Sequence, residues 1–187
     1  SPPILSAWPA GSGCRYQRAV GLNAWYPGEQ GGNAVAEVLF GDYNPGGRLP
    51  LTYYNSLDEL PAFDDYSVKN RTYQYFEGKP LYEFGYGLSY TNFKYKKKSI
   101  MQSNDTVDIT FNLSNVGKYD GDEVAQVYVR YPETGTYMPL KQLKGFSRVH
   151  LKKGKSADIT ISIPKKELRY VSDEDVVEFM GIINRIK

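Results

Sequence analysis

The chain has 187 residues, of which 41% are hydrophobic and 14% aromatic, enough to bury the core of one large domain or two small ones. Its formal net charge of +2 argues against nucleic acid as the main partner, and no apolar run reaches the roughly 18–20 residues that span a bilayer. The single cysteine, Cys14, excludes an internal disulfide, and no spacing of side chains predicts a metal site or another cofactor.

The N-terminal residues predict two short strands, a glycine-rich turn and a helix, an order that suits the edge of an α/β sheet. Residues 4–5 and 20–22 are short apolar runs, and residues 27–32 hold the turn. We expect the helix to begin at an N-cap formed by Asn33 and to end at Gly41. Its apolar residues recur on one face: Ala34, Val35, Val38 and Leu39.

Residues 44–65 predict a turn, a short strand and a polar loop. The turn is the NPGG run at residues 44–47, and the strand is residues 49–54, where Pro50 is tolerable only near the start. The loop that follows carries two pairs of carboxylates: Asp58 with Glu59, and Asp64 with Asp65. Paired carboxylates can perform acid–base chemistry or bind a cation, but on a polar loop we interpret them as solvated charges.

Residues 71–90, which we call the strap, are rich in tyrosine, phenylalanine and glycine. A solvated linker is typically rich in Gly, Ser, Pro or charge, whereas large rings lose much by remaining in water. The net charge also changes sign near residue 90, from acidic before it to basic after it. We therefore predict that the strap lies on a protein surface and ties two domains together.

From residue 91 apolar and polar residues alternate, which predicts antiparallel strands separated by turns. The predicted core is formed by Val107, Ile109, Phe111, Val127, Val129, Ile159 and Ile161. Two further runs are marked by Phe146, Val149 and Leu151, and by Val177 and Phe179. The lysines between residues 94 and 98 predict a protected edge strand. Residues 91–187 have the size of an immunoglobulin-like or fibronectin type III β-sandwich.

Several motifs resemble glycoside hydrolase family 3, which contains β-glucosidases and β-xylosidases. They include WYPGE at residues 25–29, FGDYNPGGRLP at 40–50, PLYEFGYGLSYT at 80–91 and LKGF at 143–146. The resemblance implies a mixed fold with three parts. These are the C-terminal piece of an α/β sandwich domain in residues 1–63, an aromatic strap and linker in 64–90, and an all-β, fibronectin type III-like (immunoglobulin-like) sandwich in 91–187.

The resemblance also implies a parent protein that is a retaining, exo-acting β-glycosidase of carbohydrate metabolism, hydrolysing β-linked glucosides or xylosides. Such an enzyme needs a nucleophilic Asp and an acid/base Glu, which the resemblance places upstream. No residue here matches either motif, Glu29 included, so we predict no catalytic residue in this chain and no activity of the chain alone. Its expected partners are the upstream barrel and α/β domains and, through them, an oligosaccharide, in a secreted or periplasmic enzyme.

A supporting role at the substrate pocket remains open to this chain. As substrate-binding rim residues we single out Trp25, Tyr26, Tyr73 and Tyr75. The alternative is a non-catalytic carbohydrate- or protein-binding β-sandwich module. In that case a stacking face for sugar rings would be formed by Tyr119, Tyr131 and Tyr137.

Overall fold

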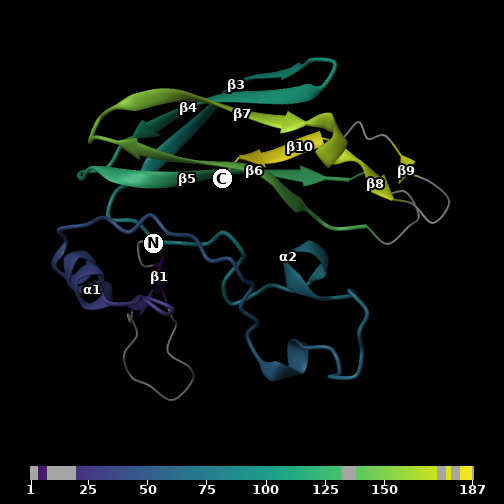
Figure 1. Cartoon of the computed structure of the whole chain (residues 1–187), viewed down its shortest axis with the longest axis horizontal. Coiled ribbons are helices and arrows are strands. Elements are labelled where there is room, and N and C mark those ends of the chain that lie inside the picture. Colours follow the sequence, from purple (N-terminus) through teal and green to yellow (C-terminus); the bar gives the residue numbers. More distant parts are fainter. Residues whose placement is uncertain (1–3, 8–19, 132–137, 172–175, 178–181, 187) are drawn as a thin grey trace.

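The computed structural model describes residues 4–7, 20–131, 138–171, 176–177 and 182–186. Figure 1 shows a β-sandwich formed by the later residues, with the earlier part of the chain packed along one of its sides. In that earlier part, β1 (Ile4–Ala7) pairs antiparallel with β2 (Val20–Asn23), which confirms the two short strands.

α1 (Gly31–Phe40) begins earlier than predicted. Gln30 is the N-cap residue, and the side-chain amide of Asn33 instead donates to Gln30 Oε1 at 2.8 Å. The early start follows from close packing of the preceding turn against the first helical residue. A Cβ on Gly31 would lie 2.4 Å from Pro27 Cβ, so this contact requires glycine.

The predicted end of α1 is correct, whereas its predicted apolar face is only partly correct. Gly41 adopts a left-handed φ of 87° and donates its N–H to Val38 O at 3.2 Å. Val38 is fully buried, but Leu39 is 65% exposed and Phe40 is 83% exposed. Leu39 is exposed because the described residues cover α1 on one side only.

Residues 49–54 do not form the predicted strand. Tyr53 makes an isolated antiparallel bridge with Tyr82 of the strap, through Tyr53 N and Tyr82 O at 2.9 Å. Pro50 cannot donate a hydrogen bond, and the opposing strap is full of turns, so no longer ladder forms here. Two short helices follow, η1 (Leu57–Glu59) and α2 (Thr72–Tyr75).

The sandwich consists of two antiparallel sheets, β10-β5-β6 and β3-β4-β7 (Figure 1). Their strands are β3 (Phe93–Gln102), β4 (Thr106–Asn115), β5 (Gly121–Arg130), β6 (Gln142–Leu151), β7 (Ser156–Pro164) and β10 (Ile182–Ile186). After β7 come η2 (Lys165–Leu168) and the pair formed by β8 (Tyr170–Val171) and β9 (Val176–Val177).

The edges of the two sheets are irregular. β3 is an edge strand, as the lysine run predicts, and its pairing with β4 shifts in register between Lys97 and Ser99. The pairing of β10 with β5 also shifts, between Ile183 and Arg185. Val177 lies in β9, whereas Phe179 lies outside the described residues.

The core lies between the two sheets and confirms the predicted alternation along β4, β5 and β7. Its buried residues are Val107, Ile109, Phe111, Leu113, Ala125, Val127, Val129, Leu151, Ile161, Ile163 and Leu168. Ile159, also predicted here, is partly buried against this cluster. Phe146 is 68% exposed, because it has the opposite parity to Val149 and Leu151 along β6.

Truncation of Phe111 to Ala should lower the free energy of unfolding by about 3–5 kcal/mol, because its ring is fully buried between the sheets. The matched control is Phe146→Ala, which removes the same ring from an exposed position and should change stability by no more than about 0.5 kcal/mol. Urea denaturation followed by circular dichroism measures both. Equal shifts of the two midpoints would show that the strand register is wrong.

Candidate functional site

The strap and residues 43–50 pack on the outer face of the sheet that contains β5 and β6, and we call this contact the seam. Along β5, the side chains of residues 125–129 are buried on both faces of the sheet. A sheet with one solvated face shows strict alternation instead. On the outer face, Gln126 and Tyr128 are only 6% and 5% exposed. The two parts of the chain therefore share a buried surface at β5.

A cluster of three rings forms the centre of the seam. Tyr73 and Phe84 stack with 4.0 Å between ring centroids, and both meet Tyr128 edge to face, at 6.1 and 6.5 Å. Aromatic pairs contribute about 0.5–1.5 kcal/mol beyond the area that they bury. The strap comes so close at Gly85, where φ is 79°, that a Cβ would lie 2.3 Å from Gln126 Oε1.

α2 anchors the start of the strap to β6. Tyr73 OH accepts a hydrogen bond from Leu143 N at 3.1 Å, and Gln74 O accepts one from Leu140 N at 2.6 Å. The side-chain amide of Gln142 donates to Gln74 Oε1 at 3.2 Å. Because β6 is an edge strand, the bond from Leu143 N satisfies a backbone group that the sheet leaves unpaired.

A buried ion pair joins the turn at residues 44–47 to the sandwich. Arg48 Nη2 and Glu123 Oε2 lie 2.5 Å apart, and their side chains are 12% and 9% exposed. Arg48 Nη1 also donates to Gly47 O at 3.1 Å, and Tyr95 OH donates to Glu123 Oε1 at 2.7 Å. Burial, reinforced by the Glu123 carboxylate, raises the pKa of Tyr95. Tyr95 therefore stays neutral and remains a donor to that carboxylate.

A second polar cluster centres on Asp122, nearer the solvent. Its carboxylate accepts from Arg148 Nε at 2.7 Å, lies 2.7 Å from His150 Nδ1 and accepts from Tyr43 OH at 3.5 Å. Partial burial would raise the pKa of Asp122, but the hydrogen bonds from His150 and Arg148 outweigh it and leave the pKa below its ordinary value. The charged carboxylate thus ties Tyr43 to β5 and β6.

Short polar contacts fix the end of the strap. Asn44 Oδ1 accepts from Tyr90 N at 2.7 Å, and Tyr90 OH donates to Val38 O of α1 at 2.7 Å. Thr91 Oγ1 donates to the buried Asn115 Oδ1 at 2.7 Å. The NPGG turn and the end of the PLYEFGYGLSYT motif are therefore bound to each other and to the sandwich.

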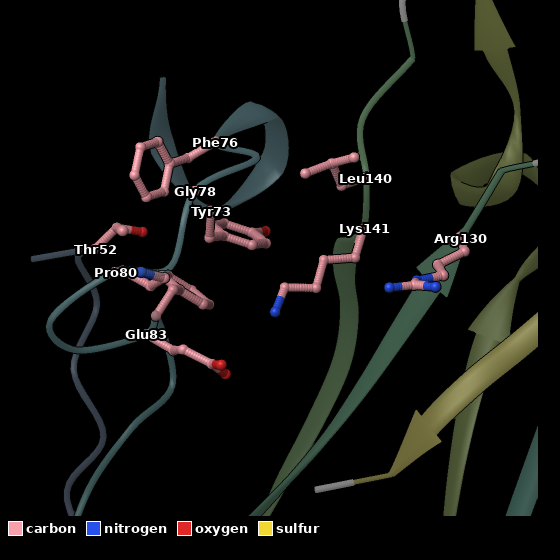
Figure 2. A pocket seen from close by; sticks show the side chains of 10 residues that line it. Thr52, Tyr73, Phe76, Gly78, Pro80, Glu83, Arg130, Leu140 and Lys141 are labelled. Atoms are coloured by element: carbon pink, nitrogen blue, oxygen red, sulfur yellow. The ribbon is translucent and has the colours of Figure 1, made fainter. Parts of the chain in front are cut away.

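A pocket of about 140 Å³, the seam pocket, opens between the strap and the start of β6 (Figure 2). It is lined by Thr52, Tyr73, Phe76, Gly78, Pro80, Glu83, Phe84, Arg130, Leu140 and Lys141. The rings come from the strap, and the two cationic side chains come from the end of β5 and the residue before β6. Figure 2 shows the side chain of Lys141 extending toward the strap, on the side where Glu83 lies.

The four predicted rim residues lie in two separate places. Tyr73 lines the seam pocket, and Tyr75 is half-buried on the same helix. Trp25 and Tyr26 lie on the turn before α1 and are 45% and 100% exposed. Figure 1 shows α1 well away from α2. Of the four predicted rim residues, Tyr73 alone therefore lines the seam pocket.

Two of the four loop carboxylates are engaged within their own loop. Asp65 accepts from Ser67 N at 2.8 Å, a bond that lowers the pKa of Asp65, and Glu59 accepts from Asn55 N at 2.8 Å. Among the described residues, no group of three or more His, Cys, Asp or Glu side chains could hold a metal ion. These contacts agree with the interpretation of the loop carboxylates as solvated charges.

Two tyrosines of the alternative hypothesis, Tyr119 and Tyr131, lie at opposite ends of β5. Tyr119 precedes β5 and Tyr131 follows it, so a strand of ten residues, about 30 Å long, separates them. The hydroxyl of Tyr131 donates to Gln142 Oε1 at 2.8 Å. Tyr137 lies outside the described residues.

Sequence reasoning missed the charged residues of the seam pocket, which are Glu83, Arg130 and Lys141. Glu83 stands inside the strap motif, where its acidity among so many rings was the available signal. Arg130 and Lys141 carry no such signal, because only the fold brings them to the strap.

The comparisons with known proteins cover both parts of the chain. A model of the glycosyl hydrolase family 3 C-terminal domain matches residues 15–90, and a fibronectin type III-like model matches residues 123–179. Xylan 1,4-β-xylosidase of Xylanibacter ruminicola is 43% identical over 151 residues, which is 80% of this chain and 17% of that protein. The periplasmic β-glucosidase of Salmonella typhimurium is 36% identical over 165 residues, which is 80% of this chain and 22% of that protein.

A solved structure gives the same result. The crystal structure of β-glucosidase from Kluyveromyces marxianus in complex with glucose matches with a TM-score of 0.77 and 34% identity, covering 84% of this chain and 21% of that one. The fold is thus a family 3 C-terminal α/β piece followed by a fibronectin type III-like sandwich, as expected.

The chain belongs to glycoside hydrolase family 3 and corresponds to the C-terminal region of its β-glucosidases and β-xylosidases. It spans about a fifth of the length of the curated relatives that it matches. The expected domain boundaries, near residues 63 and 90, stay a prediction.

Replacing Arg48 with Met should lower the free energy of unfolding by about 3–5 kcal/mol, because it leaves the Glu123 carboxylate buried without its partner. The matched control is Lys98→Met, which breaks the exposed ion pair with Asp158 and should cost less than about 1 kcal/mol. Urea denaturation at neutral pH measures both variants. If Arg48→Met proves as stable as Lys98→Met, the buried pair does not hold the seam.

Limited proteolysis with chymotrypsin should spare residues 82–90, because Tyr82 is 6% exposed and its backbone is bonded to Tyr53. The matched control is Gly87→Ala. A Cβ there would lie 2.3 Å from Gly47 O, so the strap should lift and be cut first. Mass spectrometry of the fragments identifies the sites. Rapid cleavage within residues 82–90 of the unaltered chain, with both flanking halves surviving, would make the strap an open linker.

Proposed function

We propose that this chain is the C-terminal region of a retaining, exo-acting β-glycosidase that hydrolyses β-linked glucosides or xylosides in carbohydrate metabolism. In this proposal the nucleophile and the acid/base residue lie upstream, and the chain is inactive alone and stabilises its parent. The observation that carries the proposal is the 43% identity to a xylan 1,4-β-xylosidase, with both family domains present in order.

The distribution of exposed apolar side chains supports the structural role. Among the described residues, large hydrophobic side chains more than 80% exposed all lie before residue 70: Tyr26, Phe40, Leu57, Phe63 and Tyr66. The most exposed in the sandwich, Phe146 and Met101, reach 68% and 67%. Large exposed apolar side chains are typical of interaction sites, so this part of the chain suits contact with the upstream barrel and α/β domains.

The backbone at Trp25 supports a place for Trp25 and Tyr26 on the rim of the substrate pocket. Trp25 has a left-handed φ of 52°, which bulky residues rarely adopt, and its N–H donates to Asn23 Oδ1 at 3.1 Å. Strain of this kind concentrates at functional sites. Tyr73 and Tyr75, which are half-buried, complete the rim in this proposal.

We infer that the parent enzyme is secreted or periplasmic. The inference is supported by the Salmonella typhimurium relative, which is named a periplasmic β-glucosidase. None of the described helices is long and apolar enough to cross a membrane.

The chain purified alone should hydrolyse neither chromogenic β-glucosides nor β-xylosides above the rate in buffer. General acid–base assistance supplies about 10²–10⁴-fold, and the covalent route also needs a nucleophile. The positive control is the full-length enzyme from the same gene, assayed in parallel. Turnover by the chain that survives repurification and disappears in Asp64→Asn or Asp65→Asn would contradict the proposal.

The structural role needs its own measurement on the full-length enzyme. Deleting residues 91–187 should cause loss of soluble, active enzyme, because it uncovers the strap rings that pack on Tyr128. Unchanged activity and unchanged thermal stability after this deletion would show that the sandwich does not stabilise the parent enzyme.

A further inference from the structure

We propose that residues 57–68, which we call the aromatic loop, insert their rings into an apolar pocket, rimmed by Lys or Arg, on the upstream part of the same polypeptide. The inference rests on the proposed function, because it requires this chain to be the C-terminal region of a longer enzyme. It goes further by assigning the contact to one loop and by stating the chemistry of the surface that receives the loop.

The aromatic loop holds three large apolar side chains in water. Phe63 is 98% exposed, Tyr66 is 90% exposed, and Leu57 of η1 is 83% exposed. A Phe or Tyr side chain buries roughly 150–250 Å² when it is packed, so these rings have much to gain from a partner. Figure 1 shows the segment that precedes α2 on the side of α2 away from the sandwich.

Arg71 holds the aromatic loop in shape. Arg71 Nε donates to Ser67 O at 2.9 Å, and Arg71 Nη2 donates to Ala62 O at 3.3 Å. The same Nη2 also donates to Asp65 O, and Asp65 Oδ1 accepts from Ser67 N at 2.8 Å. One guanidinium thus binds three carbonyl groups, which fixes the backbone on both sides of each exposed ring.

A second set of contacts fixes the start of the loop. The Glu59 carboxylate accepts from Asn55 N at 2.8 Å and from Asn55 Nδ2 at 3.2 Å. Asn55 Nδ2 also donates to Lys79 O at 2.6 Å. A loop held at both ends cannot turn its rings onto its own chain, and it loses little conformational entropy when a partner covers it.

The charges of the loop define the rim of the partner surface. Residues 57–68 contain four carboxylates and no Lys or Arg. Glu59 and Asp65 are engaged within the loop region, whereas Asp58 and Asp64 are exposed and form no salt bridge with the described residues. Complementary potentials across an interface therefore require cationic side chains around the apolar contact.

The exposure of the rings favours a protein pocket over a sugar as the occupant. A side chain that is 98% exposed offers both ring faces and its edge, and a sugar ring packed on one face would leave the rest in water. Aromatic anchors at protein interfaces instead fill pockets from which water is excluded. This chain spans about a fifth of the length of its curated relatives, so the proposed parent has ample upstream surface to supply such a pocket.

Hydroxyl-radical footprinting read by mass spectrometry tests the proposal on this chain and on the full-length enzyme from the same gene. The internal reference is Tyr119, which is 60% exposed, lies in the sandwich and has the same reactive ring as Tyr66. We expect Phe63 and Tyr66 to react at least about tenfold more slowly in the full-length enzyme than in the chain, because the pocket excludes water. Tyr119 should react at the same rate in both.

Two pairs of variants test the same contact through stability. In the full-length enzyme, Tyr66→Ser should lower the thermal midpoint by at least about 4 °C, and Tyr119→Ser should not. Asp64→Lys should lower it more at low salt than at high salt, whereas Asp105→Lys, on the exposed turn before β4, should have no such effect. In this chain alone, none of the four should shift the midpoint.

Equal reactivity of the two rings in the chain and in the full-length enzyme overturns the proposal. So does equal protection of Tyr119, which would indicate general shielding, and so does a full-length midpoint that is insensitive to Tyr66→Ser or to Asp64→Lys. Protection of the rings in the chain by added xylo- or gluco-oligosaccharides would assign the loop to sugar binding and also overturn it. The proposed function is tested separately by hydrolysis of chromogenic glycosides, so an active full-length enzyme with accessible rings refutes the docking alone.

Discussion

The structure depends on one strand, β5, that is buried on both faces. Its inner face packs in the sandwich core, and its outer face, through Tyr128, packs under the rings of the strap. Neither side of this contact is self-sufficient. The strap rings would lie in water without the sandwich, and Tyr128 would lie in water without the strap. Burial of apolar surface is the dominant favourable term in folding, so it holds the two parts together.

The polar contacts of the seam fix its geometry rather than supply its strength. A buried ion pair such as Arg48 with Glu123 gains little net free energy over apolar packing, because both charges lose their hydration. The pair instead disfavours a misplaced turn at residues 44–47, because a shift of that turn would leave one of the two charges buried without its partner. Asp122 acts in the same way nearer the solvent, where it joins Tyr43 to two strands. Ring burial thus supplies the strength of the seam, and the placement of the charges fixes its alignment.

The sandwich is the part of the fold that can be predicted from the sequence, because alternation with period two sets both the strand and its buried face. Phe146 marks the limit, since its hydrophobicity predicts burial, whereas its parity along β6 puts it on the exposed face. The N-terminal part is less predictable, because contacts distant in the sequence decide it. The start of α1 follows from the contact between Pro27 and Gly31, and residues 49–54 lack an opposing strand. The seam pocket combines Thr52 with Lys141, a pairing that no local pattern encodes.

The glycines of the seam limit which sandwich could replace the one in this chain. A Cβ on Gly121, at the first residue of β5, would lie 2.0 Å from Asn44 Nδ2, and one on Gly46 would lie 3.0 Å from Asp122 Cβ. A side chain at either glycine would therefore have to displace Asn44 or Asp122, so the two surfaces are closely matched at these positions. A chimera joined at residue 91 would pair halves that evolved apart. A chimera that keeps these contacts has to be joined before Asn44, well upstream of the first strand of the sandwich.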